Sequence, residues 1–152
     1  MAQNTIIDIS PRSHKNLLEA MKGEAFAFAK YKLYARQARQ SGRYEVADLF
    51  DRTADQEFFE HFAEEAELLG LVKTDEQDIK DAIAGESFEV ETMYKNFAEE
   101  AMADGDAQVA HRFLEVRQDE MNHQLAFEEA LLKMQARDRL SKPGANSRAR
   151  DF

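Results

Sequence analysis

The stretch VAHRFLEVRQDEMNHQLAFEEAL, residues 109–131, has the apolar pattern of a buried helix face. The same face also carries an acidic residue and a histidine, which are rare on buried faces. Its apolar residues recur at steps of three and four, as on the inward stripe of an amphipathic helix. Glu120 and His123 stand in the middle of that stripe, about one turn apart. The stripe consists of Val109, Phe113, Val116, Glu120, His123, Phe127 and Leu131. The stretch therefore predicts a long helix that carries a carboxylate and an imidazole into the protein interior.

The same design recurs in three other parts of the chain. Glu24, Glu57 and Glu86 each stand in an apolar stripe with helical steps. The apolar members are Leu17, Met21, Phe28, Tyr31, Ala35 and Ala38 around Glu24; Val46, Phe50 and Ala54 before Glu57; and Ile79, Ile83, Val90, Met93, Phe97 and Ala101 around Glu86. The pattern predicts four helices, over about residues 13–40, 44–69, 75–103 and 106–137.

Helix-ending residues separate these stretches, and the two halves of the chain resemble each other. Gly42, Gly70 and Gly105 lie at the expected helix ends, and Thr74-Asp75-Glu76-Gln77 has the form of a capping box. Met21-Lys22-Gly23-Glu24 is echoed by Ile83-Ala84-Gly85-Glu86. The sequence therefore predicts an all-α four-helix bundle built from two repeated helical hairpins. We expect an N-terminal extension over 1–10, the helical domain over 11–137 and a flexible tail over 138–152.

Composition excludes several classes of function. The formal net charge of -10 argues against a nucleic-acid partner, which would be repelled. The chain contains no Cys, so disulfides, thiolate metal sites and cysteine nucleophiles are excluded. No apolar run approaches the roughly 20 residues of a membrane span, and the N-terminus lacks a signal pattern. We expect a soluble protein in the cytoplasm.

Acidic residues on four buried stripes need compensation. A buried carboxylate is costly alone, and several that converge repel each other as well. Two divalent ions would bring four positive charges to five carboxylates: Glu24, Glu57, Glu86, Glu120, and Glu89 one turn after Glu86. Iron suits such a mixed set of oxygen and imidazole ligands. A Glu from each of two helices with a Glu-x-x-His from each of the other two is the known pattern of ferritin-like di-iron bundles.

Over about residues 13–134 the chain resembles the rubrerythrin family. The landmarks are Asn16-Leu17-Leu18-Glu19-Ala20, Gly23-Glu24, Thr53-Ala54-Asp55-Gln56-Glu57, Ala84-Gly85-Glu86, Thr92-Met93-Tyr94 and Glu120-x-x-His123. The resemblance implies a ferritin-like fold and two iron ions, or manganese or a mixed pair, bound by Glu24, Glu57, Glu86, Glu89, Glu120 and His123. An additional carboxylate at the position of Glu89 is similar to the rubrerythrin site and not to the ferritin site. Tyr31 and Tyr94 match the family's paired tyrosines, whose phenols are expected to donate to a bridging carboxylate.

The chain departs from the family's pattern in two places. Glu57-Phe58-Phe59-Glu60-His61 is one residue longer than Glu-x-x-His. Either Glu60 replaces the imidazole, or one inserted residue forms a π-bulge that turns His61 inward, which we favour because Leu68 and Leu69 then continue the stripe. The rubredoxin module that rubrerythrins usually append has no counterpart, so an external protein would deliver electrons. The run Glu64-Glu65-Ala66-Glu67 reads as a solvated face.

By this resemblance the expected function is a di-iron peroxidase that reduces hydrogen peroxide to water in oxidative-stress defence. The alternative is a ferroxidase, an iron-handling protein that uses dioxygen. A di-iron oxygenase acting on an organic substrate is a third hypothesis. The ligands are shared, so the ligands alone do not separate these reactions.

The short connection between the second and third helices predicts an exchange of hairpins between two chains. Glu57 lies about 18 Å before the end of its helix, and Glu86 lies about 17 Å after the start of its own. In a ferritin-like bundle these helices are parallel, so the connection would span about 35 Å. The six residue steps available reach only about 20 Å. We therefore expect a domain-swapped homodimer in which Glu24, Glu57 and His61 meet Glu86, Glu89, Glu120 and His123 of a second copy.

Overall fold

The computed structural model describes residues 9–141, which form helices joined by short turns and contain no strand. The all-α fold class predicted from the sequence is confirmed. The chain divides into two compact units, Met1–Val72 and Lys73–Phe152. Residues 1–8 of the expected extension and 142–152 of the expected tail lie outside the described part. None of the helices in 9–141 is long and apolar enough to cross a membrane.

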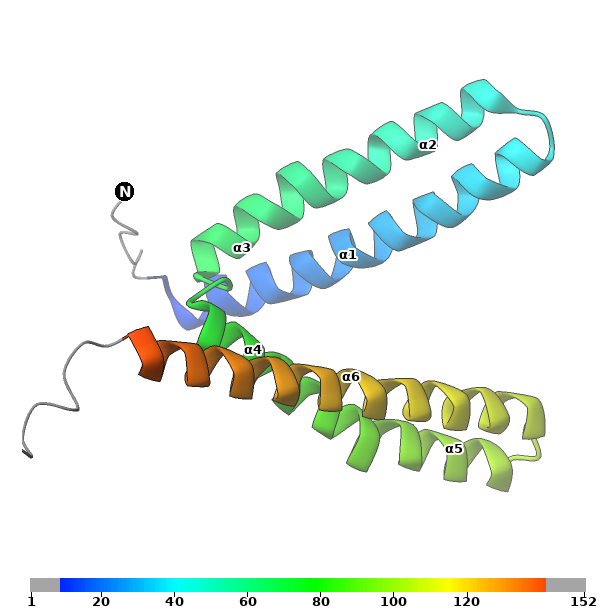
Figure 1. Ribbon diagram of the computed structural model, residues 1–152. Coiled ribbons are helices and arrows are strands. Elements are labelled where there is room, and N and C mark those ends of the chain that lie inside the picture. The colour runs from blue at the N-terminus through cyan, green and yellow to red at the C-terminus, as the bar shows by residue number, and fades with distance from the viewer. Residues whose placement is uncertain (1–8, 142–152) are drawn as a thin grey trace, which may run out of the picture. The chain divides into compact units, whose positions relative to one another are not determined.

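The first unit is a helical hairpin. Its first arm is α1 (Pro11–Gln40), and its second arm runs back along α1 as α2 (Tyr44–Gln56), the π-helical segment η1 (Glu57–Phe62) and α3 (Ala63–Leu69) (Figure 1). Helix α1 begins two residues before the expected start, because the Ser10 hydroxyl accepts from the Ser13 N–H and Pro11 fits the first helical turn. Gly42 makes the turn with φ +73°, a conformation that glycine adopts without strain.

The second unit is a second hairpin. Its first arm consists of α4 (Asp75–Phe88), η2 (Glu89–Met93) and α5 (Tyr94–Ala103), and its second arm is α6 (Ala107–Ser141) (Figure 1). The predicted capping box is present, since the Thr74 hydroxyl accepts from the Gln77 N–H. Helix α6 continues to Ser141, four residues into the segment expected to be a tail. Only the five residues 70–74 separate the last helix of the first unit from the first helix of the second.

The core of each unit is small. In the first unit, Ala35 and Ala47 are fully buried where α1 crosses α2, and Phe50 packs against them. Lys32 joins the same two helices through ion pairs with Asp51 at 3.3 Å and Asp55 at 2.5 Å. A second cation, Arg39, also pairs with Asp51, and its hydrogen bond lowers the pKa of that carboxyl.

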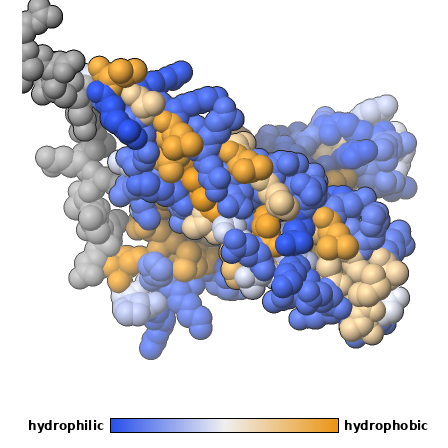
Figure 2. Space-filling view, turned by 60° about the horizontal axis from the view of Figure 1, so that its bottom comes forward, coloured by the Kyte–Doolittle hydropathy of each residue, from blue (hydrophilic) through white to orange (hydrophobic). Residues whose placement is uncertain are grey.

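Much apolar surface remains uncovered in the described residues. Val46, Phe97 and Val109, all members of the predicted stripes, are 43%, 41% and 46% exposed. Figure 2 shows apolar side chains scattered over the surface among hydrophilic ones. A two-helix hairpin has too little interior to bury such stripes by itself, so each unit presents an apolar face suited to packing against further helices.

Candidate metal centre

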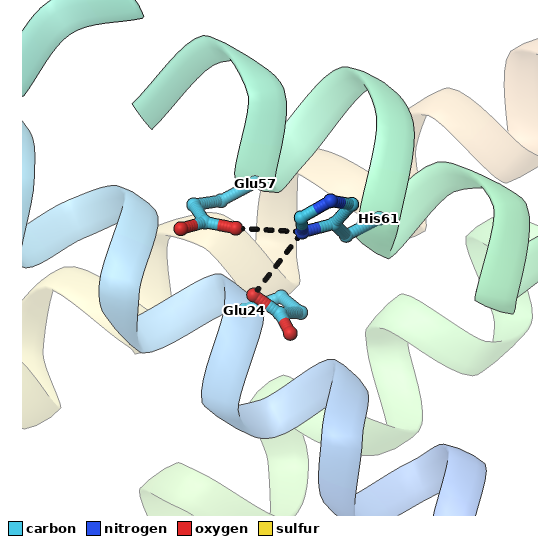
Figure 3. Close-up of side chains that lie close together, drawn as sticks. All are labelled: Glu24, Glu57 and His61. Atoms are coloured by element: carbon cyan, nitrogen blue, oxygen red, sulfur yellow. Dashed lines mark hydrogen bonds and ion pairs between the residues drawn. The ribbon is translucent and has the colours of Figure 1, made fainter. Parts of the chain in front are cut away.

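The first unit gathers three potential ligands. Glu24 comes from α1, and Glu57 and His61 come from η1 on the opposite arm. The Nδ1 atom of His61 lies 2.8 Å from Glu57 Oε2 and 3.9 Å from Glu24 Oε2 (Figure 3). One possible ligand atom of each residue lies within 4.8 Å of those of the other two. Two carboxylates and an imidazole at this spacing can share one cation.

The second unit repeats the arrangement. Glu86 comes from α4, and Glu120 and His123 come from α6. The Nδ1 atom of His123 lies 2.6 Å from Glu120 Oε2 and 3.8 Å from Glu86 Oε2. These ligand atoms also lie within 4.8 Å of one another. Each hairpin therefore carries one Glu-Glu-His group, at equivalent places of the sequence repeat.

The π-helical segment η1 accounts for the extra residue between Glu57 and His61. The N–H of Ala63 donates to the carbonyl of Phe58, five residues back, as a π turn requires. His61 then lies beside Glu57, while Glu60 accepts a hydrogen bond from Gln56 at 3.1 Å. The side chains of His61 and His123 are 48% and 57% exposed, so the prediction of imidazoles in the protein interior is wrong for the single chain. Of the two alternatives left open by the sequence, the structure shows the π turn with His61 among the carboxylates.

A second π-helical segment, η2, was not predicted. Its signal lies in the repeat: Glu24 and Glu86 are 62 residues apart, whereas Tyr31 and Tyr94 are 63 apart. One residue has therefore been added between Glu86 and Tyr94, where η2 lies. Beyond this point Ala98 is buried, whereas Phe97 of the predicted stripe is 41% exposed and packs on Phe113, with ring centroids 5.6 Å apart.

Glu89, Tyr31 and Tyr94 lie around these groups and not within them. Glu89 belongs to η2, and its charge acts on both Glu86 and Tyr94. Burial, followed by the negative charge of Glu89, raises the pKa of the Tyr94 phenol. Tyr31 packs on Phe50 and Tyr94 on Phe113, with ring centroids 5.9 and 6.1 Å apart. Within residues 9–141 neither phenol donates a hydrogen bond to a carboxylate.

The crowding of carboxylates in the two Glu-Glu-His groups shifts the pKa values of their side chains. Burial, and then a hydrogen bond with Glu57, raises the pKa of Glu24; burial and Glu120 do the same to Glu86. A hydrogen bond with Glu57 raises the pKa of His61. The Oε2 atom of Glu86 is buried and has no hydrogen-bond partner. A bound cation would satisfy this oxygen and offset the repulsion, so the residues fit a metal ion.

Glu65 is less exposed than predicted for the run Glu64-Glu65-Ala66-Glu67. Glu64 and Glu67 are exposed, as predicted for a solvated face, but Glu65 is half-buried and its Oε2 atom is enclosed without a partner. It lies four residues after His61, and its charge contributes to the raised pKa of Glu24. The first unit therefore holds a third carboxylate close to its Glu-Glu-His group.

These shifts predict an unusual pH dependence for the metal-free chain. The folded-state pKa values of Glu24, Glu86 and His61 lie above the usual 4.5, 4.5 and 6.5, so the folded state binds protons more tightly than the unfolded state. We expect the melting temperature to rise as the pH falls from about 8 to about 5. Calorimetry in the presence of a chelator measures this rise. It should shrink in the double variant Glu24→Gln/Glu86→Gln and persist in Glu64→Gln; an unchanged rise in the double variant contradicts the assignment.

Comparison with known proteins agrees with the geometry. The family model for rubrerythrin matches residues 15–70 and 57–131. The chain is 31% identical to rubrerythrin of Nitratidesulfovibrio vulgaris over 129 residues, which cover 76% of this chain and 67% of the relative. It is 30% identical to rubrerythrin of Porphyromonas gingivalis, over 74% of this chain and 62% of the relative. It is 28% identical to nigerythrin of N. vulgaris, over 72% and 60%.

The chain thus spans between about three-fifths and two-thirds of the length of these relatives. The matched residues include both Glu-Glu-His groups and both π-helical segments. The all-α chain with its two similar hairpins belongs to the rubrerythrin family.

Proposed function

We propose that the chain is a dinuclear metal protein that reduces hydrogen peroxide to water with electrons from an external donor protein. The observation that carries the proposal is the pair of Glu-Glu-His groups, one in each hairpin, whose carboxylates are crowded and in part unsatisfied. Membership of the rubrerythrin family supports iron as the metal, with manganese or a mixed pair as alternatives.

In this proposal each residue has a defined role. Glu57 and Glu120 would be the carboxylates that both ions share, Glu24 and Glu86 would each hold one ion, and His61 and His123 would provide the nitrogen ligands. Bound ferrous ions would supply the two electrons that reduce the O–O bond of peroxide. Glu89 adds a negative charge beside Glu86, which favours the more positive, oxidised state. The Tyr94 phenol, whose pKa burial and Glu89 raise, is protonated at neutral pH as phenols ordinarily are, and in this proposal it donates a hydrogen bond to a nearby carboxylate.

We also propose that the complete centre forms between two copies of the chain. Each hairpin carries half of the ligands and leaves apolar stripe residues exposed. Residues 70–74, which connect the two hairpins, form a connection as short as the prediction of a swapped dimer assumes. Its reach of about 20 Å falls short of the roughly 35 Å that a bundle closed within one chain needs. Pairing the first hairpin of one copy with the second hairpin of its partner removes this constraint.

Stopped-flow absorption of the anaerobic di-ferrous protein separates peroxide reduction from ferroxidase activity. We expect oxidation by one equivalent of hydrogen peroxide to be at least about tenfold faster than oxidation by dioxygen, because peroxide needs only the two electrons of the centre. The iron should stay bound afterwards. Glu120→Gln should lose the fast phase, and the exposed Glu115→Gln should keep it. Faster reaction with dioxygen and turnover of added ferrous iron would instead favour the ferroxidase.

A further inference from the structure

The second hairpin has an open groove between α5 and α6, with a volume of about 610 Å³. The residues that line it include Lys95, Ala98, Glu99 and Met102 of α5, and Leu114 and Arg117 of α6. The two residues of α6 do not belong to the apolar stripe that carries Glu120 and His123. The groove is therefore separate from the candidate metal centre.

The groove is cationic at one end and apolar at the other. Its two helices run in opposite directions from the turn at Gly105, so residues equally far from the turn lie at the same level. Lys95 and Arg117 lie ten and twelve residues from Gly105, and Met102 lies three residues from it. The step from Lys95 to Met102 along α5 corresponds to roughly 10 Å. Met102 and Leu114 are 57% and 48% exposed, so the groove offers apolar surface to a ligand.

The two cations of the groove have donors to spare. The Nε atom of Arg117 donates to the carbonyl oxygen of Val90 at 2.7 Å, but its two Nη atoms have no partner within residues 9–141. The Lys95 ammonium has no hydrogen bond or ion pair in the same part of the chain. Glu99, four residues after Lys95, does not pair with it, and a lysine followed by a glutamate is the weaker order for such a pair. These cations are thus available to an external anion, although the chain as a whole carries a net charge of -10.

The first hairpin supplies its own acids at the equivalent place. Lys32, which stands 63 positions before the lysine of the groove, pairs with Asp51 at 3.3 Å and with Asp55 at 2.5 Å. The residues 63 positions after these two acids are Leu114 and Gln118. The second hairpin has therefore kept the lysine, while an apolar and an uncharged side chain stand where the first hairpin has its carboxylates.

We propose that the groove binds a straight-chain monocarboxylate of about eight carbons, whose length matches the roughly 10 Å between the two ends. The carboxylate takes the role that Asp51 has in the first hairpin and accepts from Lys95 and from the Nη atoms of Arg117. The chain lies along Leu114 and Met102 toward the turn, as is usual for a mostly apolar site with a few polar groups. The groove contains no metal ligand, so the inference does not depend on the proposed metal centre.

The first test is a titration of the full-length protein with sodium octanoate, followed through the amide NMR signals of residues 95–103 and 114–117. We expect a dissociation constant of about 1–10 mM, the range for a ligand of this size with ordinary efficiency. From butanoate to octanoate, each added methylene should strengthen binding about two- to fourfold. Octylammonium, with the same chain and the opposite charge, should bind at least about tenfold more weakly than octanoate. Unmoved signals at about 20 mM octanoate, or equal binding of octylammonium, would overturn the proposal.

The second test changes the charges that line the groove. Lys95→Met removes an exposed cation without an internal partner and should weaken octanoate binding about tenfold. Leu114→Asp, which restores the acid of the first hairpin, should abolish binding, and Glu99→Gln should strengthen it about two- to threefold. Arg112→Met is the control, since Arg112 is exposed on the same helix and pairs with Glu115 outside the groove. If Lys95→Met and Arg112→Met weaken binding equally, or neither does, the site is not the groove and the proposal fails.

Discussion

Addition of Mn²⁺ to the metal-free protein is expected to raise its melting temperature by roughly 8–16 °C at about 1,000 times the dissociation constant. A ligand that binds only the folded state contributes about 4 kcal/mol at that concentration. For a chain of 152 residues, 1 kcal/mol corresponds to about 2–4 °C. The gain arises because the cation occupies the space between Glu86, Glu120 and His123, where one carboxylate oxygen is now buried without a partner.

Two controls make this measurement specific. Mg²⁺ at the same concentration should stabilise far less, because it prefers oxygen ligands and keeps its water. The variant Glu57→Ala/Glu120→Ala should lose at least about 3 kcal/mol of the metal-induced gain, corresponding to more than a hundredfold loss of affinity. Glu64→Ala, at an exposed acid in α3, should keep the full gain. A melting temperature that responds to neither Mn²⁺ nor anaerobic Fe²⁺ would refute the proposed centre.

Complementation between two inactive variants is expected to restore metal binding if hairpins are exchanged. One variant carries Glu24→Ala and Glu57→Ala in the first hairpin, and the other carries Glu86→Ala and Glu120→Ala in the second. Alone, each variant keeps one Glu-Glu-His group in every chain but lacks two of the carboxylates that a complete centre needs, so it should not hold a pair of ions. In a swapped heterodimer, one centre combines the two intact hairpins and the other combines the two altered ones. Because random association makes half of the dimers heterodimers, about a quarter of all centres should recover after the variants are unfolded together and refolded.

The control for this experiment is to mix the two folded variants without unfolding them. Exchange of hairpins requires each bundle to open, so recovery should then be slow. Metal bound per chain, measured after gel filtration, gives the result. No recovery after joint refolding, in preparations that have regained their helical circular dichroism, would show that each chain closes its own centre.

The sequence was sufficient for the fold class and for most helix limits because three of its patterns agree. Apolar steps of three and four mark the helix faces, and the glycines at 42, 70 and 105 mark the turns, all three with positive φ. The six residues of the two Glu-Glu-His groups were likewise predictable. An acid in the centre of an apolar stripe conflicts with burial, and such a conflict is typical of a functional site.

The parts that escaped prediction depend on tertiary contacts. The segment η2 has no local sequence that forbids a regular α-helix, and the structure stabilises it through Arg117, which lies 27 residues further along the chain. The sequence alone therefore did not predict the added residue in this arm or the burial of Ala98. For Glu65, the neighbouring Glu64 and Glu67 suggested a solvated run, although its spacing from His61 placed it on the inner side.

Because the connection formed by residues 70–74 is short, changing its length should change how many chains are needed to form one centre. A tether of this length links hairpins that, in the proposed arrangement, belong to different centres. A Gly/Ser insertion of about 40 residues would have a root-mean-square span of roughly 32–38 Å, enough to bring both hairpins of a single polypeptide onto one pair of ions. Such an elongated chain should elute as a monomer in gel filtration. Each chain would then hold one complete centre, which would simplify measurements of electron delivery.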